Sequence, residues 1–229
     1  HNTGSVFIKN QVIDWPKVKT NFDRVGVKYD EWDLPTLQNK IPVADFRSFY
    51  PPRRPEDPNF LEESDIWLEG ACYTPESGYV GDPQLATQNV ECAARSKGAA
   101  FRFNQRVIGI RRANQMVKGI TLDSGEQIDA PIVVNVAGPH SFQVTEMAGQ
   151  IDRNNIQTRA LRHEVHVVPP PDNYKPKKEG YHTNDADIGA YYRSEAGNMI
   201  LTGSVDPECD PKEWVDPDNF DCQVSESQW

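Results

Sequence analysis

Two histidines in one apolar segment are the first side chains whose type and spacing suggest chemistry. His163 and His166 lie within residues 156–168, a stretch whose apolar residues predict one long strand. Residues three apart on a strand face opposite sides of its sheet. The two imidazoles therefore cannot share a metal ion, and no metal site is expected here.

A hairpin of two further strands is predicted near the end of the chain. Residues 187–192 and 198–204 favour strands, and the turn residues between them join the two. With residues 156–168 they make at least three antiparallel strands.

Tyr191, Tyr192 and Arg193 lie at the end of the first strand of this hairpin. Because side chains alternate along a strand, Tyr191 and Arg193 are expected on one face of the sheet and Tyr192 on the other. The ordinary role of such tyrosines is packing across strands, and contact with a bound molecule is the alternative.

Two other groups of ligand-like residues have ordinary explanations. The acidic run Asp206–Asp221 lacks the Asp-x-Asp-x-Asp-Gly spacing of a calcium loop and contains prolines, so a solvated turn is expected. The four cysteines form no C-x-x-C pair. Cys92 is expected to be a small buried residue. Cys209 and Cys222 are expected to be reduced, with a disulfide between them as the alternative.

Residues 78–141 carry the clearest local signals for the elements that would position such side chains. Asp82 is a good N-cap, Pro83 fits the first helical position, and Gly98 is a C-terminal stop, so a helix is expected between them. Small residues recur at helical spacing and predict a stripe that lies against a sheet: Ala86, Val90, Ala93 and Ala94.

Several short strands are expected after this helix. A strand at 99–103 is followed by a β-meander, and then by a continuous apolar run typical of a strand buried on both faces of a parallel sheet. The meander covers residues 106–111, 117–122 and 127–130, and the apolar run covers 132–136. The run ends in Ala137-Gly138-Pro139, where small residues permit close approach of another molecule, so a ligand is expected there.

The first 70 residues predict smaller elements. Short strands are expected at 6–8 and 28–32, with a helix at 15–24. Asp33 is expected to cap another helix that runs to Lys40. The proline-rich residues 49–60 favour a stiff connector, with a lid or a docking segment as the alternative.

The order of these motifs resembles a known family. Gly-Tyr-Val-x-Asp-Pro, a helix, Gly-Ala-x-Phe, the meander and Val-Val-Asn-x-Ala-Gly look like the middle of the flavoprotein amine and amino-acid oxidase family, which includes D-amino-acid oxidase, glycine oxidase, sarcosine oxidase and dimethylglycine dehydrogenase. The resemblance implies an α/β and α+β fold. It consists of the rear part of an FAD-binding Rossmann-like domain with its β-meander, and a mainly antiparallel substrate-domain sheet with flanking helices.

This resemblance also implies a reaction and a set of site residues. The reaction is oxidation of the C–N bond of an amino acid or N-methylated amine to an imine, with FAD as cofactor. His163 stands where one branch of the family has the His of a His-Gln-Tyr motif, although Glu164 departs from the Gln. The implied catalytic residues are His163, Tyr191, Tyr192 and Arg193. The implied cofactor-binding residues are Val107, Asn135, Ala137, Gly138 and Pro139.

The resemblance divides the chain into three parts. Residues 1–70 and 150–229 would be two portions of the substrate domain, and residues 71–149 part of the FAD-binding domain. No strand followed by GxGxxG is present in the sequence, so the chain is expected to be an internal fragment. Alone, it is expected neither to hold FAD tightly nor to turn over. Its expected partners are a small amine or amino-acid substrate and the missing terminal segments or a second subunit. The alternative is a non-catalytic binding or interaction module on the same scaffold.

Charge and hydropathy narrow the classes of partner. The net charge of −10 argues against nucleic acid and against anionic membranes, because both attract basic patches. No apolar run approaches the length of a membrane span. The expected location is the cytoplasm, or the mitochondrial matrix in a eukaryote.

Overall fold

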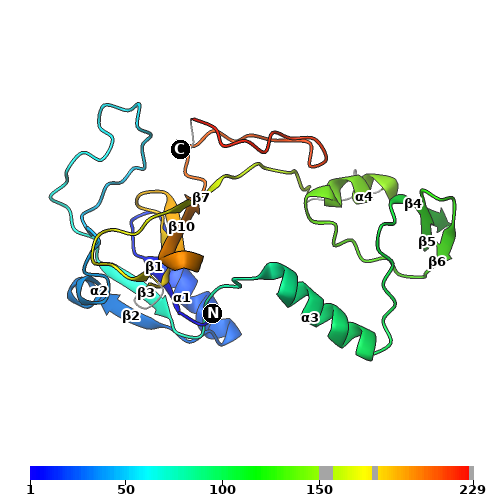
Figure 1. The fold of residues 1–229 in the computed structure, drawn as a ribbon, viewed down its shortest axis with the longest axis horizontal. Helices are drawn as coiled ribbons and strands as arrows, with labels where there is room; N and C mark the ends of the chain where they lie inside the picture. Colours follow the sequence, from blue (N-terminus) through cyan, green and yellow to red (C-terminus); the bar gives the residue numbers. More distant parts are fainter. Residues whose placement is uncertain (150–156, 177–179, 227–229) are drawn as a thin grey trace. The chain divides into compact units, whose positions relative to one another are not determined.

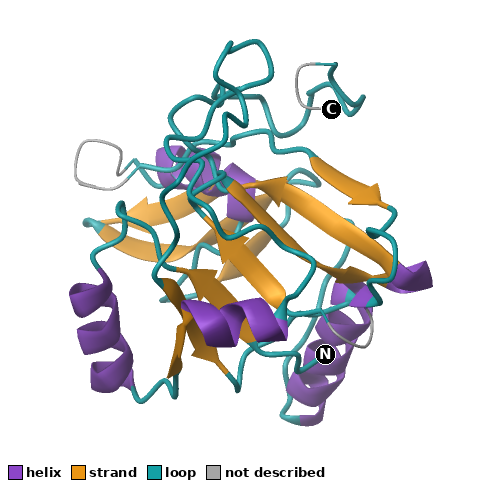
Figure 2. Cartoon of the chain, turned by 90° about the vertical axis from the view of Figure 1, so that its left-hand side faces the viewer, coloured by secondary structure: helices purple, strands orange, loops and turns teal. Residues whose placement is uncertain are grey.

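The structure, a computed structural model, describes residues 1–149, 157–176 and 180–226. They form two compact units, and Figure 1 labels most of their helices and strands. The large-sheet unit comprises residues 1–86, 163–212 and those from 224 onward, and the small-sheet unit comprises residues 87–162 and 213–223. Loops, teal in Figure 2, make up much of the chain between the strands and helices.

The large-sheet unit contains a seven-stranded sheet in the order β2-β3-β1-β8-β9-β10-β7. Its elements are β1 (Ser5–Ile8), α1 (Trp15–Val25), β2 (Asp30–Asp33), α2 (Leu34–Lys40), β3 (Gly70–Thr74), β7 (Val165–Val168), β8 (His182–Asp185), β9 (Ala190–Glu195), the 3-10 turn η3 (Ala196–Asn198) and β10 (Met199–Ser204). Strand β1 pairs in parallel with β8, and every other pairing between these strands is antiparallel. The fold is therefore mixed α/β with a mainly antiparallel large sheet, as expected.

An aspartate N-cap precedes each of the two helices of this unit. Asp14 Oδ1 accepts a hydrogen bond from Lys17 N at 3.1 Å, and Asp33 Oδ1 accepts one from Thr36 N at 2.9 Å. Each acceptor satisfies a backbone N–H that the first turn of a helix leaves unpaired. Both predicted helices are confirmed, and the expected cap at Asp33 is confirmed with them.

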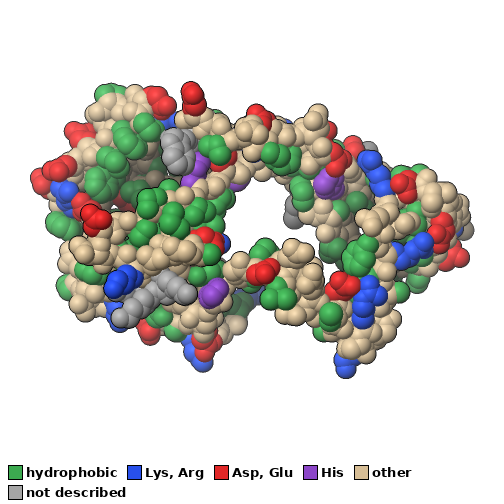
Figure 3. Space-filling model, in the orientation of Figure 1, with side chains coloured by type: hydrophobic (Ala, Val, Ile, Leu, Met, Phe, Trp, Pro, Cys, Tyr) green, Lys and Arg blue, Asp and Glu red, His purple; other side chains and the backbone are tan. Residues whose placement is uncertain are grey.

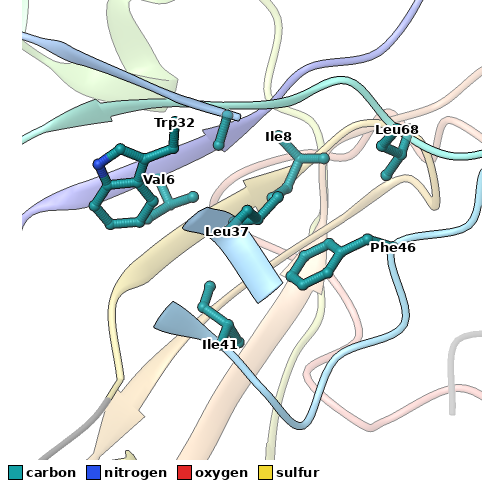
Figure 4. Close-up of a cluster of buried hydrophobic side chains, with 8 residues drawn as sticks. Val6, Ile8, Trp32, Leu37, Ile41, Phe46 and Leu68 are labelled. Carbon is teal, nitrogen blue, oxygen red and sulfur yellow. The ribbon is translucent and has the colours of Figure 1, made fainter. Parts of the chain in front are cut away.

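The core of the large-sheet unit lies between the sheet and α2. Figure 4 shows its apolar side chains converging from β1, β2, α2 and the segments that flank the loop before β3. Leu37 of α2 is completely buried, and Trp32 of β2 stacks on Tyr73 with ring centroids 4.3 Å apart. The buried cluster consists of Val6, Ile8, Trp32, Leu37, Ile41, Phe46, Leu68 and Ala71.

The small-sheet unit is built around the predicted β-meander, which is confirmed. Its elements are most of α3 (Pro83–Ser96), β4 (Val107–Ala113), β5 (Met116–Leu122), β6 (Gln127–Asp129), the 3-10 turn η1 (Gly138–His140) and α4 (Ser141–Met147). The expected cap of α3 is also confirmed, because Asp82 Oδ1 accepts from Leu85 N at 2.8 Å and Gly98 follows the helix with φ +92°.

Two predicted strands of this unit do not form. Residues 99–103 and 132–136 contain no strand, and the side chains of Ile132, Val134 and Val136 are 76%, 74% and 86% exposed. A strand is stabilised by hydrogen bonds to a neighbouring strand. Within the described part of the chain, no strand lies beside either segment. Both segments have the apolar residues of a strand, but the neighbouring strand that each prediction required is not present among the described residues.

The predicted burial of α3 is also wrong. The helix is fully described and has no buried residue, and Val90 is 69% exposed. Cys92, expected to be buried, is exposed for the same reason. Helix caps depend on neighbouring residues alone, whereas burial of the stripe requires a sheet to cover it. All four cysteines are free.

The strands near the end of the chain differ from prediction in their limits. The 156–168 strand shrinks to β7, because Leu161 instead forms a β-bridge with Trp214 in the small-sheet unit. Ile156 lies outside the described residues. The hairpin of β9 and β10 is confirmed, but β9 starts three residues later than predicted because residues 186–189 form a turn. Strand β8 was not predicted.

Candidate functional site

A row of polar side chains runs across the large sheet from β8 to the edge strand β7. Thr202 of β10 is directly opposite Tyr192 on one side and His166 of β7 on the other. Thr183 of β8 is in turn opposite Tyr192. Directly opposed residues in an antiparallel ladder share a face, so Tyr192, Thr202 and His166 form one row.

Tyr192 is the most strongly perturbed acid in this row. Burial raises the pKa of its hydroxyl, and the nearby Asp185 carboxylate raises it further. Burial also raises the pKa of Asp185 to about 6. A phenol in such surroundings keeps its proton, so Tyr192 can donate a hydrogen bond but is a poor general base.

Tyr191 lies against the backbone of the neighbouring strand. A Cβ placed at Gly203 would come within 2.6 Å of Tyr191 Oη, so the ring occupies space that only a glycine leaves open. The carbonyl oxygen of Tyr191 also accepts from Thr202 Oγ1 at 3.0 Å. Gly203 thus positions Tyr191, a role that sequence analysis missed.

Arg193 is held by groups close to it in sequence and space. It donates to Glu195 Oε2 at 2.8 Å and to the carbonyl of Ser194 at 2.9 Å. Its guanidinium lies 4.4 Å from the centre of the Tyr79 ring. A substrate carboxylate at Arg193 would therefore compete with Glu195.

His163 lies outside the row. It is exposed in an irregular segment two residues before β7, whereas His166 is inside the strand and in register with Thr202. The structure thus brings together Tyr192 and His166, of which only Tyr192 was predicted. Strand alternation distinguishes the two histidines, but only the pairing of β7 with β10 identifies which one lies in the row with Tyr192 and Thr202.

The predicted cofactor residues occupy the small-sheet unit. Asn135 Nδ2 donates to the carbonyl of Ser141 at 2.9 Å, and its Oδ1 accepts from Ala137 N at 3.2 Å, so Asn135 shapes the entry into η1. Gly138 has φ +57°, and no described atom lies within 4 Å of a Cβ built on it. The space beside Gly138 is therefore open to a bound group.

A cavity of about 440 Å³ opens beside Pro139. Its walls include Phe142 of α4, Trp214, and Arg159, whose guanidinium lies 4.5 Å from the centre of the Trp214 ring. The size suits a small-molecule group, and the arginine offers a positive charge. Val107, by contrast, begins β4, pairs with Leu122 and does not line this cavity. These features fit one side of an FAD site: open backbone, a cavity and a cation.

The described residues offer neither a cluster of metal ligands nor a helix suited to a membrane. No group of three or more His, Cys, Asp or Glu side chains there is arranged to hold a metal ion. No described helix combines the length and the apolar character needed to cross a bilayer.

Comparison with protein families gives one match. The family described as "DAO: FAD dependent oxidoreductase" matches residues 30–228. No curated protein sequence matches the chain.

Three solved structures with the same fold align with 89–100% of this chain. L-proline dehydrogenase from P. horikoshii is 19% identical with a TM-score of 0.70, and the match covers 100% of this chain and 53% of that one. Glycine oxidase from Bacillus cereus is 18% identical with a TM-score of 0.58, covering 100% and 52%. L-amino acid deaminase from Proteus vulgaris is 15% identical with a TM-score of 0.57, covering 89% and 42%. The chain thus spans about half the length of these proteins.

Proposed function

The chain belongs to the DAO family of FAD dependent oxidoreductases, and from this premise we propose that it is part of an enzyme that oxidises the C–N bond of an amino acid or an N-methylated amine. In this reaction the carbon beside nitrogen loses a hydride and the nitrogen loses a proton, which leaves an imine that water hydrolyses. The observation that carries the proposal is the family match, which extends through both units.

The substrate class is supported by the fold relatives. The three solved structures are named for proline, glycine and L-amino acids as a class. We extend that class to this chain because its large sheet presents a protonated phenol and an imidazole in one row. Groups of this kind can orient an amine and exchange its proton.

Each unit has its own part in the proposed enzyme. FAD, when bound, supplies the oxidising chemistry because it accepts the hydride. Tyr192 donates a hydrogen bond from Oη to the substrate, and His166 takes up the proton released from nitrogen. His163 and Tyr191 remain candidates for substrate contact, and Arg193 for a carboxylate in exchange for Glu195.

The small-sheet unit would hold the cofactor. The cofactor would lie against Ala137, in the open space beside Gly138 and in the cavity beside Pro139. Asn135 would fix the turn, and Val107 would contribute from the start of β4. The exposed apolar residues 132–136 would pair with strands from polypeptide that this sequence does not include. The isolated 229-residue chain is accordingly proposed to bind FAD weakly and to be inactive.

The first test compares this chain with the product of a longer reading frame. The purified 229-residue chain should show no flavin absorbance band, whereas a longer product with an upstream GxGxxG segment should be yellow. Anaerobic addition of amino acids or N-methylated amines should then bleach the flavin of the longer protein. A longer protein that binds no flavin would favour the interaction module instead.

A second test addresses the site itself in the longer protein. Tyr192→Phe removes one donated hydrogen bond and should slow flavin bleaching about 100-fold, the scale of a lost proton-handling group. Tyr29→Phe is the matched control, because Tyr29 is a partly exposed tyrosine after α1 whose hydroxyl donates to Asp23, far from the row. Equal rates for the two variants would rule out a catalytic role for Tyr192.

A further inference from the structure

A second cavity lies in the large-sheet unit, under the long loop that connects α2 to β3. The base of this loop is closed by a β-bridge between Arg47 and Trp67 and by a hydrogen bond from Ser48 N to the carbonyl of Ile66 at 2.7 Å. Figure 1 shows the loop as a long light-blue and cyan excursion between α2 and β3. The cavity has a volume of about 470 Å³, a size typical of small-molecule sites.

The floor of the cavity is fixed to the sheet. Asp187, which is 1% exposed, accepts from Ser48 Oγ at 2.9 Å and from Phe49 N at 2.6 Å. Asp187 lies in the turn between β8 and β9, so it ties the loop to the large sheet. Both Asp187 and Phe49 line the cavity. The walls are therefore held in place rather than formed by a loosely attached loop.

One buried polar group in the wall lacks a partner. Asn10 lines the cavity, is 8% exposed, and accepts hydrogen bonds at Oδ1 from Val12 N and Ile13 N at 3.0 and 3.2 Å. These bonds fix the orientation of the amide. Its Nδ2 then has no acceptor among the described residues. Buried amide N–H groups are normally paired, so a ligand oxygen is the missing partner that the geometry suggests.

The uncompensated charge on the walls is negative. The cations Lys9 and Arg53 already have partners: Lys9 is paired with Glu31 at 2.7 Å, and Arg53 donates to the carbonyl of Asn59 at 3.0 Å. The carboxylates of Glu62 and Glu69 form no ion pair within the described part of the chain. A cationic group in the cavity would lie beside these two carboxylates.

Aromatic rings complete the wall. Tyr50 and Trp67 both line the cavity, and they are 39% and 51% exposed. Ring faces attract organic cations, and the attraction adds to that of nearby carboxylates. The cavity thus combines an unpaired buried donor, free carboxylates and accessible rings.

We propose that this cavity binds a small organic cation that also carries a carbonyl or carboxylate oxygen, as in an amino-acid amide. The oxygen accepts from Asn10 Nδ2, and the ammonium group lies beside Glu62 and Glu69. No residue assigned to the proposed reaction lines the cavity, so this inference stands or fails separately from that function.

The test is calorimetric titration of the purified protein with three related probes. Phenylalaninamide carries both the ammonium and the carbonyl, phenethylamine lacks the carbonyl, and 3-phenylpropanamide lacks the amine. Phenylalaninamide should bind measurably, and each of the other two about tenfold more weakly, because each lacks one recognition group. Absence of phenylalaninamide binding, or equal affinity for all three probes, would overturn the proposal.

Variants locate the binding site. Asn10→Asp keeps the Oδ1 acceptor and removes the Nδ2 donor, and it should weaken phenylalaninamide binding about tenfold. The double variant Glu62→Gln with Glu69→Gln should weaken phenylalaninamide binding to a similar degree. If circular dichroism shows that Asn10→Asp is unfolded, the double variant alone tests the site. Asp65→Asn is the control, since Asp65 is an exposed carboxylate of the same loop outside the cavity. Unchanged affinity in the folded cavity variants would place any binding elsewhere and overturn the proposal.

Discussion

The two units differ in how far their apolar residues are buried. The large-sheet unit encloses a cluster in which Val6 and Leu37 have no exposed surface. In the small-sheet unit, Leu122 is the one apolar residue classed as buried among those described. Figure 3 shows green apolar side chains at the surface over the region of α3 and the small sheet. The local sequence signals for helices and strands are nevertheless clearest at residues 78–141, most of which belong to the small-sheet unit.

The two units show that a helix can be stabilised by residues close to it in sequence, whereas a strand must be stabilised by a segment far from it in sequence. Helix α3 forms because Asp82 caps it, although nothing described covers its apolar stripe. The apolar run at 132–136 does not form a strand, because no amount of local preference replaces the hydrogen bonds of a neighbour. A strand therefore forms only where the described chain supplies a neighbouring strand, whereas a capped helix forms without one.

The largest expected effect is in the core. Leu37→Ala should lower the free energy of unfolding by about 2–5 kcal/mol, because it leaves a cavity in a completely buried site. Ile132→Ala, in the exposed run of the small-sheet unit, should change it by about 0.5 kcal/mol or less. Urea denaturation followed by circular dichroism measures both. Similar losses in the two variants would mean that the units do not differ in burial as described.

A smaller loss of stability is expected when a glycine in the large sheet is replaced by alanine. Gly203→Ala in β10 should destabilise the protein by about 1–3 kcal/mol, since the new Cβ meets Tyr191 Oη at 2.6 Å. Gly109→Ala in β4 is the control in the other unit, because no described atom lies within 4 Å of its Cβ. Thermal melting distinguishes the two, and a stable Gly203→Ala variant would show that Tyr191 moves without cost.

The pH dependence of stability should also distinguish the units. Burial raises the pKa of Asp185 to about 6, above its value in an unfolded chain, so the native state binds the extra proton. Its stabilising contribution is complete below pH 4 and is lost as the pH rises toward 6, a change on the order of 2 kcal/mol. In the small-sheet unit, Arg102 instead lowers the pKa of Glu126, which reverses the sign.

Urea titrations between pH 4.5 and pH 7 test this directly. The unfolding midpoint of the wild-type chain should fall across the window, and Asp185→Asn should remove most of the fall. A midpoint that falls equally in Asp185→Asn would assign the dependence to another group. Glu126→Gln should leave the slope in this window unchanged, because its pKa is lowered rather than raised.

The smallest effect is expected at the helix caps. Asp82→Ala and Asp33→Ala each remove one acceptor from a helix start, at a cost of about 1 kcal/mol. Because α2 contributes Leu37 to the core, loss at Asp33 should appear in global unfolding. Helix α3 has no buried residue, so loss at Asp82 should appear as faster hydrogen exchange within α3 alone. Equal global losses would indicate that α3 is packed after all.

The candidate site could be predicted only in part. Tyr191, Tyr192 and Arg193 were located on one strand from their surroundings in the sequence, and the hairpin that carries them is correct. His166 was noticed but not assigned to the site, because its neighbour Thr202 is 36 residues away and the register between β7 and β10 has no sequence signature. The roles of Asp187 and Asn10 were missed, since nothing in a sequence reveals that a polar residue is buried.

The sequence by itself determined the elements that depend on near neighbours: the capped helices α1, α2 and α3, the β-meander, and the hairpin of β9 and β10. It also identified the family, through the order of its short motifs. The tertiary structure alone decided that residues 99–103 and 132–136 form no strand, which histidine joined the row with Tyr192, and where cavities opened. Caps and turns are satisfied within a few residues, whereas strand pairing, burial and cavities require segments that the chain brings together from far apart.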